Sequence, residues 1–250
     1  TIQSDGYIDR ARSDLRSWHA SGAYIGERHS IQAHILSGAE KTYQAWYGVP
    51  AQYADDPALR TFNPAGAERP GTPYDNEVDD YFQRHHLLHY RLLCTPSLTL
   101  QLNGHYTRGY GFFEQYKAAQ AFADYGLPDW QGGDTTLLKT DLVRRRWLDN
   151  HFYGATFVLI WTPPVNPPFL AKNPQFMLGG AVSRYEGRHF GDVIWAEYAI
   201  PQNWIYYDND ALKDDANLYL KSDFFFSNGL SAMLDLQVRR VAYRFEGFDS

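Results

Sequence analysis

The sequence predicts an all-β protein, an antiparallel up-and-down meander of about eight long strands. Apolar and polar residues alternate through most of the chain, as side chains do on the two faces of a strand, whereas helical periodicity is confined to one stretch, 114–125. Several alternating stretches run for 12 residues or more, although strands in soluble domains usually have five or six. We therefore expect a sheet of unusually long strands.

Four hairpins account for the alternating stretches: 12–25 with 30–37, 80–93 with 98–109, 144–162 with 174–187, and 213–226 with 230–245. Gly, Pro and Asn punctuate the joints at 26–29, 94–97 and 227–229, and a longer Pro-rich segment from Thr162 makes the third joint. The links between hairpins are long, at 38–79, 110–143 and 188–212. Short turns at one end of a sheet and long loops at the other are typical of outer-membrane barrels.

The segment 97–117 illustrates the two-faced pattern. Leu98, Leu100 and Leu102 point to one side and residues 99, 101 and 103 (Thr, Gln and Asn) point to the other. A soluble sandwich gives the same alternation with its apolar face turned inward, so this pattern leaves both architectures open. Strand length favours the membrane barrel, and so do the aromatic residues near strand ends. These are Tyr24, Trp46, Tyr81, Tyr106, Trp147, Trp161 and Tyr185.

Composition narrows the function classes. Aromatic residues make up 16% of the 250 residues, and 19 of them are Tyr, which suits surfaces that are apolar at one end and wet at the other. A net charge of -6 argues against nucleic acid as a partner. The one cysteine, Cys94, excludes an internal disulfide. We find no nucleophile elbow, P-loop, zinc-protease or dinucleotide motif, so the sequence predicts neither an enzyme nor a cofactor.

Six segments resemble those of a TonB-dependent outer-membrane receptor of the kind common in Bacteroidetes. They are 38–50 (GAEKTYQAWYGVP), 60–66 (RTFNPAG), 105–117 (HYTRGYGFFEQYK), 124–129 (DYGLPD), 183–195 (SRYEGRHFGDVIW) and 206–219 (YYDNDALKDDANLY). The resemblance implies a TonB box, a plug domain and a 22-stranded transmembrane barrel around the plug. Residues 1–250 show neither TonB box nor plug. We therefore expect them to be an internal part of the barrel domain, forming an open, strongly curved sheet whose first and last strands do not pair with each other.

The resemblance also implies a function. Such receptors lie in the outer membrane of Gram-negative bacteria and import a scarce nutrient such as a ferric siderophore or other iron complex, cobalamin, or an oligosaccharide. The implied partners are outer-membrane lipid and lipopolysaccharide, the TonB complex through a missing N-terminal region, and the small-molecule ligand. The alternative is a soluble secreted β-sheet protein that binds carbohydrate through its aromatic loops.

Aromatic residues in the long links are the candidate ligand-binding residues, at the extracellular end. They are Trp46, Tyr47, Tyr110, Phe112, Phe113 and Tyr116. Rigid rings give contact area at low entropic cost, which suits a ligand vestibule. The alternative is that these rings pack loop against loop.

Three charged or histidine-rich groups have simpler interpretations than metal or ligand sites. His85 and His89 share a face but lie about 13 Å apart along a strand, so lumen-facing polar roles are expected for them and for His86. The acids at 208, 210, 214 and 215 lack the spacing of a calcium loop, and a solvated loop leading into a strand is expected instead. Residues 144–146, three arginines at a predicted strand end, would suit either lipopolysaccharide or a solvated rim.

Overall fold

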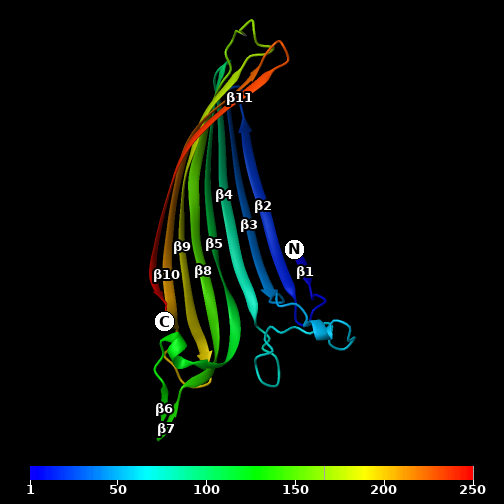
Figure 1. Ribbon diagram of the computed structural model, residues 1–250, viewed down its shortest axis with the longest axis vertical. Helices are drawn as coiled ribbons and strands as arrows, with labels where there is room; N and C mark the ends of the chain where they lie inside the picture. The colour runs from blue at the N-terminus through cyan, green and yellow to red at the C-terminus, as the bar shows by residue number, and fades with distance from the viewer. Residues whose placement is uncertain (166, 250) are drawn as a thin grey trace.

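The chain folds as a nine-stranded antiparallel sheet in a single curved layer (Figure 1). The computed structural model describes residues 1–165 and 167–249. The strands of the sheet, in spatial order, are β1 (Ile2–Ser4), β2 (Ser13–Ile25), β3 (His29–Tyr43), β4 (Val78–Thr95), β5 (Leu98–Ala121), β8 (Lys139–Trp161), β9 (Gln175–Ala196), β10 (Trp204–Phe225) and β11 (Ser231–Asp249). A separate hairpin joins β6 (Trp130–Gly132) to β7 (Thr135–Leu137), and two 3-10 turns are η1 (Ala51–Tyr53) and η2 (Phe122–Tyr125).

The predicted open meander is confirmed. All eight long strands are present, each paired with its neighbour in sequence, and they run from 13 residues in β2 to 24 in β5. The strands β1 and β11 lie at the two ends of the sheet order. The short strand β1, which pairs with residues 13–15, and the β6–β7 hairpin were not predicted.

The strands continue further into the predicted links than expected. Short joints gather at one end of the sheet, and the connections at 44–77, 122–138 and 197–203 gather at the other, the loop end (Figure 1). The helical prediction for 114–125 is wrong. Most of this segment continues β5 in pairing with β8, interrupted by an irregularity between Lys117 and Gln120 where Ala119 has a φ of 50°. Cross-strand pairing overrides the helical propensity of its Ala, Gln and Glu residues.

The strand register places mainly apolar residues next to one another, and mainly polar residues next to one another, across all eight long strands. The row through Leu102 reads, from β2 to β11, Tyr24, Ile31, Tyr90, Leu102, Phe157, Gly180, Leu218 and Val238. The adjacent row, one residue on, reads Ala23, Gln32, His89, Asn103, Thr156, Ala181, Asn217 and Arg239. Paired residues share a face, so the sheet has an apolar face through Leu102 and a polar face through Asn103.

Residues 98–106 of β5 mark an apolar band on the apolar face. The row through Leu100 contains six leucines, at 92, 100, 159, 178, 220 and 236. Rings border the band: Trp161 stacks on Phe176 near the short turns, and Tyr106 pairs with Tyr153 toward the loop end. Nine residues match the 9–11 that a tilted transmembrane strand needs.

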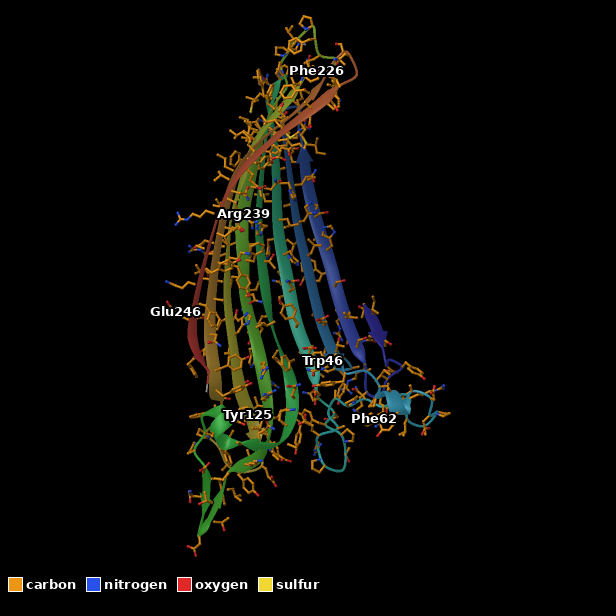
Figure 2. All side chains as sticks on the ribbon, viewed as in Figure 1. Trp46, Phe62, Tyr125, Phe226, Arg239 and Glu246 are labelled. Atoms are coloured by element: carbon orange, nitrogen blue, oxygen red, sulfur yellow. The ribbon has the colours of Figure 1, made fainter. Side chains whose placement is uncertain are left out.

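The apolar face is open rather than buried. Leu102 is 41% exposed and Val238 66%, and Figure 2 shows side chains projecting from both sides of one layer. The only sheets among the described residues are the nine-stranded sheet and the small β6–β7 hairpin. A soluble sandwich would bury this face against a second sheet, so the geometry disfavours that alternative.

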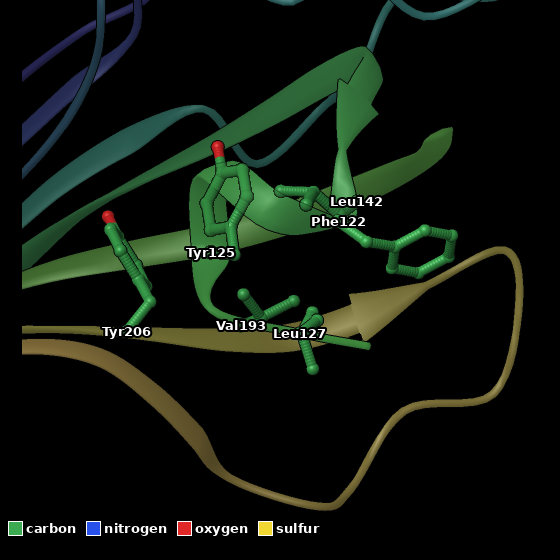
Figure 3. Packing of buried hydrophobic residues seen from close by; sticks show 6 residues of the cluster. All are labelled: Phe122, Tyr125, Leu127, Leu142, Val193 and Tyr206. Carbon is green, nitrogen blue, oxygen red and sulfur yellow. The ribbon is translucent and has the colours of Figure 1, made fainter. Parts of the chain in front are cut away.

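Most of the buried hydrophobic residues lie at the loop end, where connections fold back onto the sheet. Phe122, Tyr125 and Leu127 of the β5–β8 connection pack with Leu142, Val193 and Tyr206 of three strands (Figure 3). The 44–77 connection is fixed separately: Tyr43, Ala65 and Val78 form a second cluster, and Tyr43 donates a hydrogen bond to the carbonyl of Tyr74. These contacts give the loop end a defined structure.

Candidate functional site

A hollow of about 440 Å³ lies on the polar face near the loop end, spanning β3 to β10. Two adjacent rows of paired residues form it. One row reads Glu40, Tyr81, Gly111, Leu148 and His189, and the next reads Thr42, Asp79, Phe113, Arg146 and Gly191. Each row contains a carboxylate, an aromatic ring and a basic side chain. In the first row these are Glu40, Tyr81 and His189, and in the second they are Asp79, Phe113 and Arg146.

Glycines make the centre of the hollow shallow. A Cβ atom on Gly111 would lie 2.6 Å from the Cα of Tyr81, and one on Gly109 would lie 2.1 Å from the Tyr81 hydroxyl. The Tyr81 ring therefore lies flat over the bare backbone of β5 instead of standing up from the sheet. Flat rings and bare backbone leave room above the sheet for another molecule.

The charges of the hollow are separated. Burial, and to a lesser extent the nearby Glu40 carboxylate, raises the pKa of the Asp79 carboxyl above its ordinary value. Arg146 donates to the hydroxyl of Tyr206 at 3.3 Å and lies 5.9 Å from the ring centre of Phe113. The site thus has an acidic flank on β3–β4 and a basic flank on β8–β9, with aromatic rings between them.

Three of the six predicted aromatic residues come together beside this hollow. The ring of Trp46 packs edge-on against those of Phe113 and Tyr47, with ring centres 6.0 Å and 6.2 Å apart, and Trp46 remains 55% exposed. Phe113 lines the hollow itself. Trp46 and Tyr47 lie in the 44–77 connection, and Figure 2 places Trp46 where the strands meet it.

The other three predicted aromatic residues, Tyr110, Phe112 and Tyr116, lie on the opposite face of the sheet. The prediction that four of the six lie in loops is wrong. Tyr110, Phe112, Phe113 and Tyr116 are all part of β5. Tyr110 and Phe112 pack against Trp147 with ring centres 5.2 Å and 4.5 Å apart. Tyr116 is 6% exposed, stacks on Trp195 and donates a hydrogen bond to Asp141. Alternation separates the odd-numbered Phe113 from its even-numbered neighbours.

Histidines form a chain across the polar face that the sequence did not reveal. His19 Nε2 lies 3.2 Å from His34 Nδ1, and the ring of His34 packs edge-on against His89. His89 Nδ1 lies 2.8 Å from Asn103 Oδ1, and Asn103 donates to Thr156 at 3.0 Å. These five residues come from five adjacent strands, so only the register brings them together. His86, predicted to face the lumen with His85 and His89, is paired with Tyr106 on the apolar face.

The acids at 208, 210, 214 and 215 all lie in β10. The prediction of a solvated loop is wrong for Asp208 and Asp210, whereas Asp214 and Asp215 lie within the predicted strand 213–226. Three of the four carboxylates form ion pairs with arginines of the two neighbouring strands: Arg188 with Asp208, Arg184 with Asp214, and Arg239 with Asp215. The Arg184 pair is bidentate, with N–O distances of 2.6 and 3.0 Å. In the described part of the chain, no three His, Cys, Asp or Glu side chains are arranged to hold a metal ion.

The arginines at 144–146 divide between the two faces. Arg144 donates to Tyr125 and Gln115, and Arg146 lines the polar-face hollow. Arg145 lies on the apolar face, where it donates to Glu114 at 2.7 Å and covers the ring of Phe112 at 4.2 Å. They do not form the single basic cluster that was considered for lipopolysaccharide.

Long meandering strands, open edges and two faces of different polarity are typical of part of the wall of a β-barrel. The chain is similar to the unliganded ferric citrate transporter FecA, with a TM-score of 0.61 and 10% identity over 95% of this chain. This likeness confirms the fold predicted from the resemblance to TonB-dependent receptors. The chain spans 34% of the FecA chain's length.

Two structures of the ferric-catecholate import receptor Fiu from E. coli K12 also match. The closed form gives a TM-score of 0.30 at 9% identity and the open form 0.33 at 10%, covering 96% of this chain and 41% and 45% of Fiu, respectively. No family model and no curated protein matches the sequence. None of these structures supports an origin in Bacteroidetes. Within residues 1–165 and 167–249, no helix is long and apolar enough to cross a membrane.

Proposed function

We propose that residues 1–250 form part of the wall of an outer-membrane transporter that imports a scarce nutrient, such as a ferric siderophore or other iron complex. One observation carries this proposal: every long strand presents apolar residues to one face and polar residues to the other, and the apolar face is exposed. In a transmembrane barrel the apolar band meets lipid and the polar face lines the lumen.

The fold supports a transport role over an enzymatic one. FecA is a ferric citrate transporter, and this chain has the fold of part of its barrel. Transport needs binding and passage but no covalent chemistry, in keeping with a hollow of charges and rings that contains no nucleophile–base pair. Cobalamin and oligosaccharides are further ligand classes compatible with such a site. As part of a receptor of this kind, the segment would work with a plug domain and the TonB complex.

The surface next to the apolar band suggests the lipid partner. On the apolar face toward the loop end, Arg188 and Arg244 line a hollow of about 390 Å³ together with the acids Asp149, Asp210 and Glu246. We propose that this charged surface contacts lipopolysaccharide of the outer leaflet. Arginines would bind its phosphates directly, and the acids would bind through divalent cations.

Arginine scanning at neighbouring positions of β5 tests the membrane assignment. Leu100→Arg places a charge in the apolar band and should oppose bilayer insertion by roughly 2–4 kcal/mol. Gln101→Arg, the matched control, adds the same charge to the polar face and should insert like the wild type. The measurement is the folded fraction in lipid vesicles across a urea series.

Equal insertion of the two variants would contradict the proposal. Extraction offers a second readout, because a wall segment should remain with the membrane until detergent is added. Release into buffer without detergent would favour the soluble carbohydrate-binding alternative.

A further inference from the structure

The polar-face hollow holds opposite charges that do not neutralise one another. Among the described residues, the side chains of Glu40 and Asp79 have no salt bridge or hydrogen bond, and Arg146 has no carboxylate partner. Elsewhere on this sheet most arginines are paired with acids, as Arg184 is with Asp214. The hollow therefore stands out as a place where acidic and basic side chains lie close together without ion-pair partners.

The register fixes the separation of the two flanks. Asp79 and Arg146 both pair with Phe113, one from β4 and the other from β8, so they lie two strand spacings apart, about 10 Å. Glu40 and His189 are four spacings apart in the adjacent row, or about 19 Å. In the described part of the chain, no salt bridge joins the two flanks. A bound molecule could reach both.

The middle of the hollow favours an apolar or aromatic group. Phe113 and the flat ring of Tyr81 lie between the flanks, and Leu148 adds an aliphatic surface. Gly111 leaves the backbone bare between them, so nothing stands up to block a molecule lying along the row.

We propose that this hollow binds an elongated zwitterion, with its ammonium group at Glu40 and Asp79, its anionic group at Arg146, and an apolar centre against Phe113. This inference rests on the proposed import function and adds the chemical class of the ligand. The ammonium end of the ligand would pair with the acids, and the anionic end would pair with Arg146. A molecule that carries only one of these charges should therefore bind more weakly than the zwitterion.

A set of three tripeptides serves as the probe. Free Gly-Phe-Gly carries an ammonium and a carboxylate about 10 Å apart around one ring. Its N-acetylated and C-amidated forms each lack one charge. Binding is measured by calorimetry on the full-length protein in outer-membrane vesicles. We expect each capped form to bind at least tenfold more weakly than the free peptide.

Variants assign each end of the peptide to its flank. In Glu40→Gln/Asp79→Asn, acetylation should no longer change affinity, whereas amidation still should. In Arg146→Gln, amidation should no longer change affinity, whereas acetylation still should. Glu186→Gln, a matched loss of charge on the apolar face, should preserve both effects. Among the described residues, Glu40 and Asp79 have no hydrogen-bond or ion-pair partner to lose, and Glu186 loses only a hydrogen bond from Tyr153.

Three results would overturn the inference: no binding of any peptide, equal binding of free and capped forms, or cap effects that persist in the matching variants. None of them bears on the membrane assignment, which depends on the Leu100→Arg and Gln101→Arg comparison. Failure of that comparison would instead remove the proposed function itself.

Discussion

The ring of Tyr81 on β4 lies over Gly109 on β5, where a Cβ atom would come within 2.1 Å of the tyrosine hydroxyl. Gly109→Ala should therefore displace the ring and lower the free energy of unfolding by about 1–3 kcal/mol. Gly38→Ala, on the same face but with nothing within 4 Å of its Cβ position, is the control and should be neutral. Urea unfolding in detergent micelles measures both, and equal effects would contradict the covering role of Tyr81.

Glu114 connects the 44–77 connection to the sheet. This buried carboxylate accepts hydrogen bonds from Tyr74 at 2.5 Å, Asn76 at 2.6 Å and Arg145 at 2.7 Å. Glu114→Gln removes its charge and should destabilise the connection by about 2 kcal/mol. Limited proteolysis should then cut residues 44–77 sooner. Glu246→Gln, at an exposed position, is the control, and equal protection in both variants would argue against this role.

Glu77 should make the same connection sensitive to pH. The residue is 4% exposed, and burial raises the pKa of its carboxyl from 4.5 to about 7. A raised pKa means that the folded state holds the proton more tightly than the unfolded state. The resulting stability, on the order of 3 kcal/mol, is complete below pH 4.5 and is lost as the pH rises to about 7.

Hydrogen exchange of residues 44–77 between pH 4 and pH 8, corrected for the intrinsic exchange rate, measures this effect. Protection should fall across that interval in the wild type and remain level in Glu77→Gln. A wild-type profile that matches the variant would exclude Glu77 as the source.

Lipopolysaccharide retention should depend on arginines of the apolar face. Arg188→Gln with Arg244→Gln removes two cations from the charged hollow beside the apolar band, and retention after mild detergent extraction should weaken roughly tenfold. Arg146→Gln removes a cation from the other face and should have no effect. Loss of retention in the control alone would reverse the proposed orientation of the sheet.

Alternation within single strands made most of the fold predictable. Leu100 and Gln101 point to opposite faces whatever their neighbours are, so alternation predicts the eight long strands, their face polarity and their hairpin pairing, but not the short strands β1, β6 and β7. Strand ends were less predictable. Asp208 and Asp210 resemble loop residues in the sequence, and only the structure shows Arg188 of β9 paired with Asp208. That partner lies on the neighbouring strand, beyond any local pattern.

The candidate site depended on information that the sequence does not contain. Glu40 and His189 belong to one row only because four strand registers add up, and long connections separate several of those strands. The same holds for His19, His34 and His89. Alternation did contain one usable signal, because it requires Arg145 to face away from Arg144 and Arg146.

The strictly sequential order of the strands has a consequence for how the sheet assembles. Each long strand hydrogen-bonds to the long strands next to it in chain order, so no pairing must wait for a distant long strand. The entropic cost of closing each hairpin stays small where the joint is short, as between β4 and β5. Assembly can therefore proceed by zipping from one hairpin to the next, with the 44–77 and 122–138 connections as the slow steps.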